Sequence, residues 1–171
     1  MIVETERLVL RKPRLEDAHD LVEAYSDAET MRYIGDGATK DLAGTEDAIR
    51  RWLQRWDEWE IGFFVLERKE DARVVGRSGF LRWDPQTWEV GGPETEIGWT
   101  VARAHWGRGY ATEAALAMRD WAFGERGLTR LISLIQPGNQ RSVRVAEKLG
   151  ERYERDVLVF GHATRLYSVE R

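Results

Sequence analysis

Two glycines that lead from a strand-like segment into a helix-like segment constrain this chain more than any other feature. The turn is Trp106-Gly107-Arg108-Gly109-Tyr110, and an alanine-rich stretch follows it. The first four amide N–H groups of a helix have no intrahelical partner, and the helix dipole adds partial positive charge there. Glycine lets the main chain approach a ligand closely. The segment therefore predicts a strand, a glycine turn and a helix whose start can bind phosphate or pyrophosphate.

The same turn is compatible with a tight connection that binds nothing, because short glycine motifs are common. It is not a Walker P-loop, since no Gly-Lys-Ser/Thr follows, and it lacks the third glycine of a dinucleotide fingerprint. A plain nucleotide-binding protein remains an alternative, and it predicts tight binding of ADP.

Length and composition limit the other possibilities. The chain has 171 residues, 42% of them hydrophobic, which predicts one domain over residues 1–171. A net charge of −4 without a lysine or arginine run argues against a nucleic-acid partner. The absence of cysteine excludes a cysteine nucleophile and thiolate metal sites. No uncharged stretch approaches the roughly 18 residues of a membrane helix, and the N-terminus has no apolar leader segment, so we expect a soluble cytoplasmic protein without a membrane partner.

Periodicity predicts an alternation of strands and helices along the chain. Strands are expected at about residues 5–11, 62–67, 74–83, 94–101, 131–136, 152–159 and 163–169. Helices are expected at about residues 15–25, 45–58, 110–123 and 139–149, with a short helical turn at 27–34. Some strands follow one another as hairpins and others are separated by helices. This order predicts a mixed, mostly antiparallel α/β sheet of about seven strands flanked by helices.

Four stretches carry a family resemblance. They are Thr5–Arg11, Glu96–Trp99, Trp106–Ala114 and Asn139–Gly150. In this order and spacing they resemble the GNAT superfamily of N-acetyltransferases, and within it the RimJ/RimL type that acetylates N-terminal α-amines of ribosomal proteins. The resemblance implies a GNAT-like acyl-CoA N-acyltransferase fold, acetyl-CoA as co-substrate, and a glycine turn that binds its pyrophosphate. Trp106 stands where the superfamily usually has Gln or Arg, a variant associated with the RimJ/RimL branch.

The expected coenzyme site combines this resemblance with the physics of the turn. The turn amides hold the pyrophosphate and Arg108 adds a charge, while an exposed strand edge hydrogen-bonds the pantetheine arm. A bulge at Gly98 is expected to separate that strand from its neighbour. Core packing is nevertheless the default interpretation for the three tryptophans Trp99, Trp106 and Trp121. The expected coenzyme-binding residues are Trp99, Val101, Trp106, Gly107, Arg108, Gly109, Tyr110, Ala111, Thr112, Asn139 and Ser142.

Acetyl transfer to a primary amine requires a group that accepts a proton. Glu96 is the expected base, because strand alternation places it with Gly98 on one face while Ile97 and Trp99 take the other. Glu94 shares that parity and is its rival. Each is also compatible with a solvent-facing carboxylate. A main-chain N–H near Trp99 is expected to polarise the carbonyl.

The departing thiolate requires a proton or other stabilisation. Many superfamily members place a tyrosine in the helix after the asparagine, but the aligned residue here is Ala146. The resemblance implies Ser142 as the substitute, although a serine there is also an ordinary helix-start residue. Tyr153 and Tyr167 are lesser candidates for this acid.

The remaining polar clusters give weaker signals. His19, His105 and His162 have no spacing typical of a metal site, so no metal is expected. His105 can touch a phosphate, but a surface position is favoured. The group of Arg50, Arg51 and Arg55 with nearby tryptophans can wall a substrate pocket, but a solvated face backed by a core stripe is favoured.

These observations predict an acetyl-CoA-dependent N-acetyltransferase acting by direct transfer. The acceptor is a protein N-terminal α-amine or, alternatively, a small-molecule amine such as a polyamine, aminoglycoside or amino acid, because residues 14–60 hold no discriminating motif. A non-catalytic acyl-CoA-binding or sensing domain is the alternative of another class, and a homodimer is compatible with the family.

Overall fold

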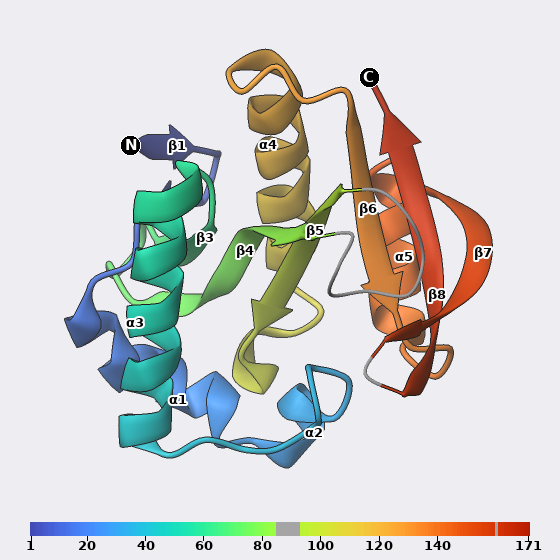
Figure 1. The fold of residues 1–171 in the computed structure, drawn as a ribbon. Helices are drawn as coiled ribbons and strands as arrows, with labels where there is room; N and C mark the ends of the chain where they lie inside the picture. The colour runs from blue at the N-terminus through green and yellow to red at the C-terminus, as the bar shows by residue number, and fades with distance from the viewer. Residues whose placement is uncertain (85–92, 160) are drawn as a thin grey trace.

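Eight strands form one mixed sheet in the computed structural model, which describes residues 1–84, 93–159 and 161–171 (Figure 1). Their order across the sheet is β1-β2-β3-β4-β5-β6-β8-β7, and every neighbouring pair is antiparallel except β5 and β6. This confirms the expected mostly antiparallel sheet. The strands are β1 (Ile2–Glu4), β2 (Leu8–Arg11), β3 (Phe63–Arg68), β4 (Val74–Trp83), β5 (Glu94–Val101), β6 (Arg130–Ile135), β7 (Arg152–Val159) and β8 (His162–Glu170).

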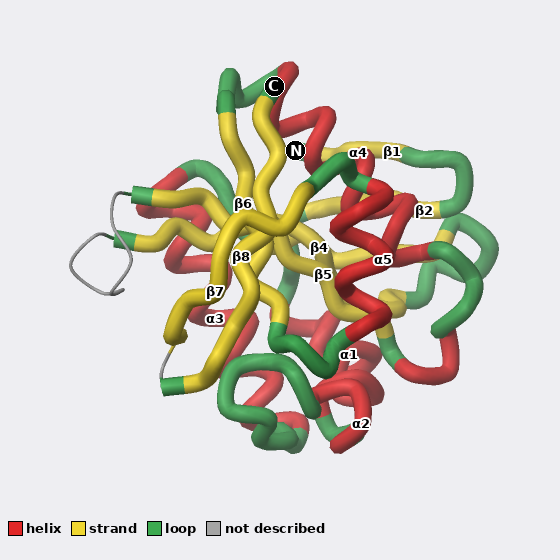
Figure 2. Tube along the Cα trace, turned by 90° about the vertical axis from the view of Figure 1, so that its right-hand side faces the viewer, coloured by secondary structure: helices red, strands yellow, loops and turns green. Residues whose placement is uncertain are grey.

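Helices cover both faces of this sheet, with α3 on one side and α4 and α5 on the other (Figure 2). Five α-helices and two short 3₁₀ helices are assigned in the described ranges. The helices are η1 (Leu15–Asp17), α1 (Ala18–Tyr25), α2 (Ala28–Met31), α3 (Leu42–Trp59), η2 (Arg103–His105), α4 (Tyr110–Gly124) and α5 (Gln140–Lys148). In the parts of the chain that the structure describes, no helix combines the length and apolarity needed to cross a membrane.

The two faces of the sheet carry different apolar clusters because side chains alternate along each strand. Helix α4 packs on one face against Phe64 and Ile97, which are fully buried. Helices α1 and α3 pack on the other face against Phe63 and Val65. Trp52 and Trp56 of α3 are buried in these clusters, which confirms the core stripe expected for this helix.

Two expected boundaries are wrong because side chains outside the local pattern decide them. The strand expected at residues 5–11 begins only at Leu8, and an unexpected strand, β1, precedes it and pairs with it as a hairpin. The Thr5 hydroxyl hydrogen-bonds both the N–H and the carbonyl of Leu8 and turns the chain between them. Helix α3 begins at Leu42, three residues before the predicted start. The Asp41 side chain accepts a bond from the N–H of Gly44 and caps it.

The expected bulge at Gly98 is also wrong. The register between β4 and β5 runs without a shift from Gly76 opposite Val101 to Trp83 opposite Glu94. Strand β5 leaves its other neighbour instead, because the only registered pair between β5 and β6 in the described ranges is Glu96 with Ile132. The sheet therefore opens beyond Glu96, and the C-terminal half of β5 presents a free edge.

Candidate active site

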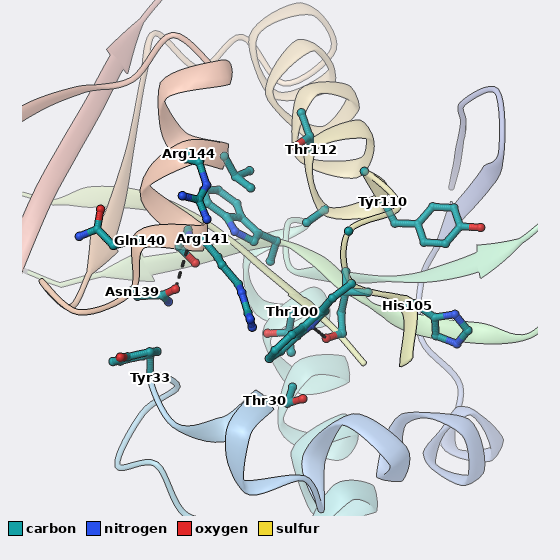
Figure 3. A pocket seen from close by; sticks show the side chains of 18 of the residues that line it. Thr30, Tyr33, Thr100, His105, Tyr110, Thr112, Asn139, Gln140, Arg141 and Arg144 are labelled. Carbon is teal, nitrogen blue, oxygen red and sulfur yellow. Dashed lines mark hydrogen bonds between the residues drawn. The ribbon is translucent and has the colours of Figure 1, made fainter. Parts of the chain in front are cut away.

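A cleft of about 820 Å³ lies where the sheet opens. The end of β5, the starts of α4 and α5, and the α2 segment surround it, and side chains from α2 and α5 face each other across it (Figure 3). Its size is within the range of small-molecule and cofactor sites. Ten of the eleven expected coenzyme-binding residues line this cleft: Trp99, Val101, Trp106, Gly107, Gly109, Tyr110, Ala111, Thr112, Asn139 and Ser142. Arg108 is exposed and is not among the lining residues.

The glycine turn forms one end of this cleft. Gly107 and Gly109 have φ values of +76° and +84°, a region that residues with side chains rarely adopt. Gly109 is the N-cap of α4 and supplies no side-chain cap, so the first-turn amides are left to another acceptor. An anion that enters the cleft meets these amides and the positive end of the helix dipole.

An ion pair from the N-terminal hairpin holds the turn in this orientation. The Arg7 guanidinium bonds the Glu113 carboxylate through Nε at 2.7 Å and the carbonyl of Arg108 through Nη1 at 2.8 Å. The carbonyl and N–H of a planar trans peptide point in opposite directions. The N–H of Gly109 is therefore turned away from Arg7, which is not among the residues that line the cleft.

We expect Arg7→Met to weaken binding of coenzyme A about tenfold, since hydrogen bonds to charged groups contribute roughly 1.5–3 kcal/mol. Without the guanidinium, the peptide group between Arg108 and Gly109 loses the hydrogen bond that fixes its orientation. Calorimetric titration with coenzyme A measures the effect. Arg73→Met is the matched control, because Arg73 is similarly exposed and pairs with Glu23, and neither residue lines the cleft. Equal affinity of Arg7→Met and wild type would contradict this role.

The free edge of β5 forms the floor of the cleft. Trp99, Thr100 and Val101 line it, and β6 has already diverged at these positions. The carbonyl of Val101 accepts a 2.7 Å bond from the Trp106 indole, so this tryptophan ties the turn to the end of the strand. The edge geometry is compatible with a ligand that hydrogen-bonds as an added strand.

Helix α5 supplies the opposite wall. Asn139 caps it as expected, with its side-chain oxygen 3.2 Å from the N–H of Ser142. Sequence reasoning missed three basic residues on the cleft face of this helix, Arg141, Arg144 and Lys148. Their spacing of three and four residues is the signal that would have found them. The Arg141 guanidinium lies 4.1 Å from the centre of the Trp106 ring.

Glu96 lies where the pairing of β5 and β6 ends. Its carboxylate accepts a 2.8 Å bond from the Trp83 indole and a bond from the main-chain N–H of Leu134. Burial raises the pKa of Glu96 to about 7, while the Trp83 bond and the charge of Arg77 oppose that rise. A carboxylate with a pKa near neutrality is suited to act as a general base.

Its rival Glu94 has a different environment. The Glu94 carboxylate forms an ion pair with Arg130 at 3.2 Å. A carboxylate that is bonded to a guanidinium is less free to contact another group than one without an ion-pair partner. The two carboxylates of β5 thus differ in their contacts.

A second buried carboxylate, which sequence reasoning missed, belongs to Glu151. It is 3% exposed and bonds Ser133 Oγ at 3.0 Å, and Ser133 in turn bonds the carbonyl of Ile97 at 3.0 Å. Burial, together with the charge of Glu96, raises the pKa of Glu151 to about 8, while the Ser133 bond opposes the rise. A protonated Glu151 can donate to Ser133, which can then donate to Ile97 beside the opening of the sheet.

Glu151 makes folding stability depend on pH. Its pKa is higher in the folded state than the ordinary 4.5, so its protonated form stabilises the fold and this contribution is lost as pH rises through about 8. We expect Glu151→Gln to be more stable than wild type at pH 9 and to lose less stability between pH 6 and 9. Urea denaturation at several pH values measures both. Parallel curves for the two proteins would contradict a protonated Glu151.

The other candidates divide between the cleft and the rest of the fold. His105 is 8% exposed, so the surface position favoured from the sequence is wrong; it lines the cleft, and its Nδ1 has no described partner. Tyr167 is buried in a cluster with Ala146 and Trp99. Tyr153 is 53% exposed on β7. Of the two tyrosines, Tyr167 is therefore closer to the cleft wall.

Comparison with known proteins places this arrangement in a family. Residues 7–152 match the family model described as Acetyltransferase (GNAT) domain. The chain is 32% identical over 150 residues, 88% of this chain and 82% of the other, to the uncharacterized N-acetyltransferase p20 of Bacillus licheniformis. The chain belongs to the GNAT acetyltransferase family, and it is an acyltransferase enzyme.

Solved structures share the whole fold. A GNAT-family acetyltransferase from Bacillus anthracis superposes with a TM-score of 0.83 at 27% identity, covering 99% of this chain and 98% of the other. RimL, described as a ribosomal L7/L12 α-N-protein acetyltransferase in complex with coenzyme A, superposes with a TM-score of 0.81, covering 99% of this chain and 98% of the other. Its identity is 14%, so this likeness shows the fold alone.

Proposed function

We propose that the protein transfers an acetyl group from acetyl-CoA to a primary amine, with Glu96 as the base. One observation carries the proposal: the cleft joins an anion-binding helix start, the cations of α5 and the free edge of β5. Glu96, whose pKa is raised to about 7, lies three residues before Trp99 on the same strand and is not itself among the residues that line the cleft. These features fit the three parts of the coenzyme, which are a diphosphate, a 3′-phosphorylated nucleoside and an amide-bearing pantetheine arm.

Each wall has a role in holding this donor. The amides from Gly107 to Thr112 face the diphosphate, and Arg141, Arg144 and Lys148 complement the remaining negative charge. The edge of β5 at Trp99 and Val101 hydrogen-bonds the pantetheine amides and directs the thioester toward Glu96. Asn139 adds a hydrogen bond to the same arm.

The transfer itself requires one base, one polarising donor and one acid. Glu96 accepts a proton from the acceptor ammonium, directly or through water, and the freed amine forms a C–N bond to the acyl carbon. A main-chain N–H near Trp99 stabilises the negative charge on the carbonyl oxygen. The C–S bond breaks, the nitrogen loses its second proton, and the sulfur takes a proton relayed through Ser142, with Tyr167 as the alternative donor.

We propose a protein N-terminal α-amine as one class of acceptor. The support is the RimJ/RimL pattern of the sequence together with the shared fold of RimL. A small-molecule amine is the second candidate, because the wall formed by Thr30, Tyr33 and Ile34 faces the same cleft.

Coenzyme A release tests this function. Purified protein with acetyl-CoA and a mixed panel of peptides, polyamines, aminoglycosides and amino acids should release coenzyme A in a thiol assay, above the rate without amine. A protein that binds acetyl-CoA but releases none with any amine would be the non-catalytic alternative. Tight binding of ADP without preference for the pantetheine arm would indicate a nucleotide-binding protein instead.

A further inference from the structure

A buried guanidinium lies on the same sheet face as Glu96. Arg77 of β4 and Glu96 of β5 both point toward the side covered by α1 and α3, because strand alternation puts Arg77 opposite Thr100 and Glu96 opposite Leu81. Arg77 is 9% exposed. The charge of Arg77 lowers the pKa of Glu96, yet the two side chains form no ion pair in the described ranges.

The contacts of the Arg77 guanidinium do not include a carboxylate, and they leave one of its nitrogens without a hydrogen bond in the described ranges. Its Nε donates to the Tyr25 hydroxyl at 2.6 Å, and its guanidinium lies 3.8 Å from the centre of the Phe63 ring. Its Nη1 has no hydrogen-bond partner among the residues that the structure describes. Buried charges in proteins are normally paired, since an unpaired one is costly.

Gly98 separates the cation from the carboxylate. A Cβ added at Gly98 would lie 3.8 Å from Arg77 Nη1 and 3.9 Å from Phe63, with nothing closer. Gly98 and Glu96 are both partly exposed. Gly98 thus leaves the face between the guanidinium and the carboxylate without a side chain of its own, and a methyl group added there would meet only ordinary van der Waals contacts.

Further positive charge gathers beside Arg77. Arg55 of α3 is partly buried. Burial together with the charges of Arg51 and Arg77 lowers its pKa, while the charge of Glu58 opposes that fall. None of the three arginines has an acidic ion-pair partner among the residues that the structure describes. By contrast, Arg50 on the same helix is paired with both Glu46 and Asp47.

We infer that the acceptor is an amine that also carries a carboxylate a few bonds away, bound with its ammonium toward Glu96 and its carboxylate toward Arg77 and Arg55. Glu96 acts on Arg77 and Glu58 acts on Arg55 only at longer range, and a substrate carboxylate would supply the ion-pair partner that neither guanidinium has within the described residues. Guanidinium–carboxylate bonds are among the stronger hydrogen bonds. A free amino acid and a peptide with an acidic first residue both present this chemistry. The inference rests on the proposed function, because it assigns the acceptor side of the same reaction.

Matched acceptor pairs test the inference. Initial rates with acetyl-CoA are compared for amino acids and their amides, and for peptides that begin with Asp or Asn. We expect kcat/KM to be at least tenfold higher for the acceptor that carries the carboxylate in one of these two comparisons. A preference among the amino acids indicates a free amino acid as acceptor, and a preference among the peptides indicates a peptide with an acidic first residue. Binding of each pair to the protein saturated with coenzyme A, measured by calorimetry, provides a readout that does not depend on turnover.

Variants locate the preference. Arg77→Met should reduce the ratio within each pair to near one, Arg77→Lys should restore part of it, and Arg55→Met should lower it several-fold. Arg82→Met is the control, because Arg82 is exposed on the opposite face of β4 and its loss removes the same charge. If Arg77→Met does not fold, Arg77→Lys and Arg55→Met decide the outcome.

Two results separate failure of this inference from failure of the proposed function. Acetylation and binding of carboxylate and amide members to equal extents, or a preference that survives in both Arg77→Met and Arg55→Met, would overturn the inference and leave the acetyltransferase intact. Lack of acetyl-CoA binding together with no release of coenzyme A with any amine would overturn the function itself.

Discussion

Gly109→Val should lower the affinity for acetyl-CoA by more than tenfold while the fold persists. Valine at φ +84° carries a left-handed strain of roughly 1–3 kcal/mol, and a branched side chain adds to it. Its Cβ would also lie 3.4 Å from Arg7 Nη2, the group that holds the turn. The chain must then rotate its peptide groups, and the amides leave the cleft. Calorimetric titration with acetyl-CoA measures the loss.

Two other glycines serve as comparisons for this variant. Gly107→Ala has a similar positive φ but open space around its Cβ, so it should weaken binding less than Gly109→Val. Gly124→Ala lies at the far end of the same helix with no neighbour within 4 Å, and it should leave binding unchanged. Undiminished affinity in Gly109→Val would remove the turn from the diphosphate site.

Glu96→Gln should reduce kcat by about 10²–10⁴-fold with little change in the affinity for coenzyme A. Glutamine keeps the shape of the side chain and can still accept the Trp83 bond, but it cannot take a proton at neutral pH. In the wild type, kcat/KM should rise with pH through about 7, because only the deprotonated carboxylate acts as base. This inflection should disappear in the variant.

Glu94→Gln is the matched control for the base. It removes a carboxylate from the same strand face that is already paired with Arg130. Its kcat should stay within a few-fold of the wild type. Equal turnover of Glu96→Gln and wild type would exclude Glu96 from the mechanism, and a larger loss in Glu94→Gln would transfer the role to its rival.

Local signals predicted the features whose causes are local. Alternation and turn residues located the strands, Asn139 and Gly150 marked the ends of α5, and the two glycines located the turn. Strand alternation predicted that Glu96 and Gly98 share one face of β5, and the unshifted register with β4 confirms it. Each of these follows from residues within a few positions of one another.

Features that depend on distant partners were not predictable in this way. The turn between β1 and β2, where a strand was expected, is accompanied by contacts of Thr5 and Arg7 with Glu113, more than a hundred residues away. The pairing of Glu151 with Ser133 arises only when β6 and the segment after α5 meet in the fold. The opening of the sheet results from the way β6 diverges from β5, which no residue of β5 encodes alone. Periodicity describes an element, but it does not say which elements will be neighbours.

A crystal structure of the protein with acetyl-CoA tests the central claim most directly. We expect the diphosphate within hydrogen-bond distance of main-chain N–H groups between Gly107 and Thr112, and the pantetheine arm along Trp99 and Val101 with its sulfur directed toward Glu96. Coenzyme bound elsewhere, or no coenzyme at saturating concentration, would contradict the account.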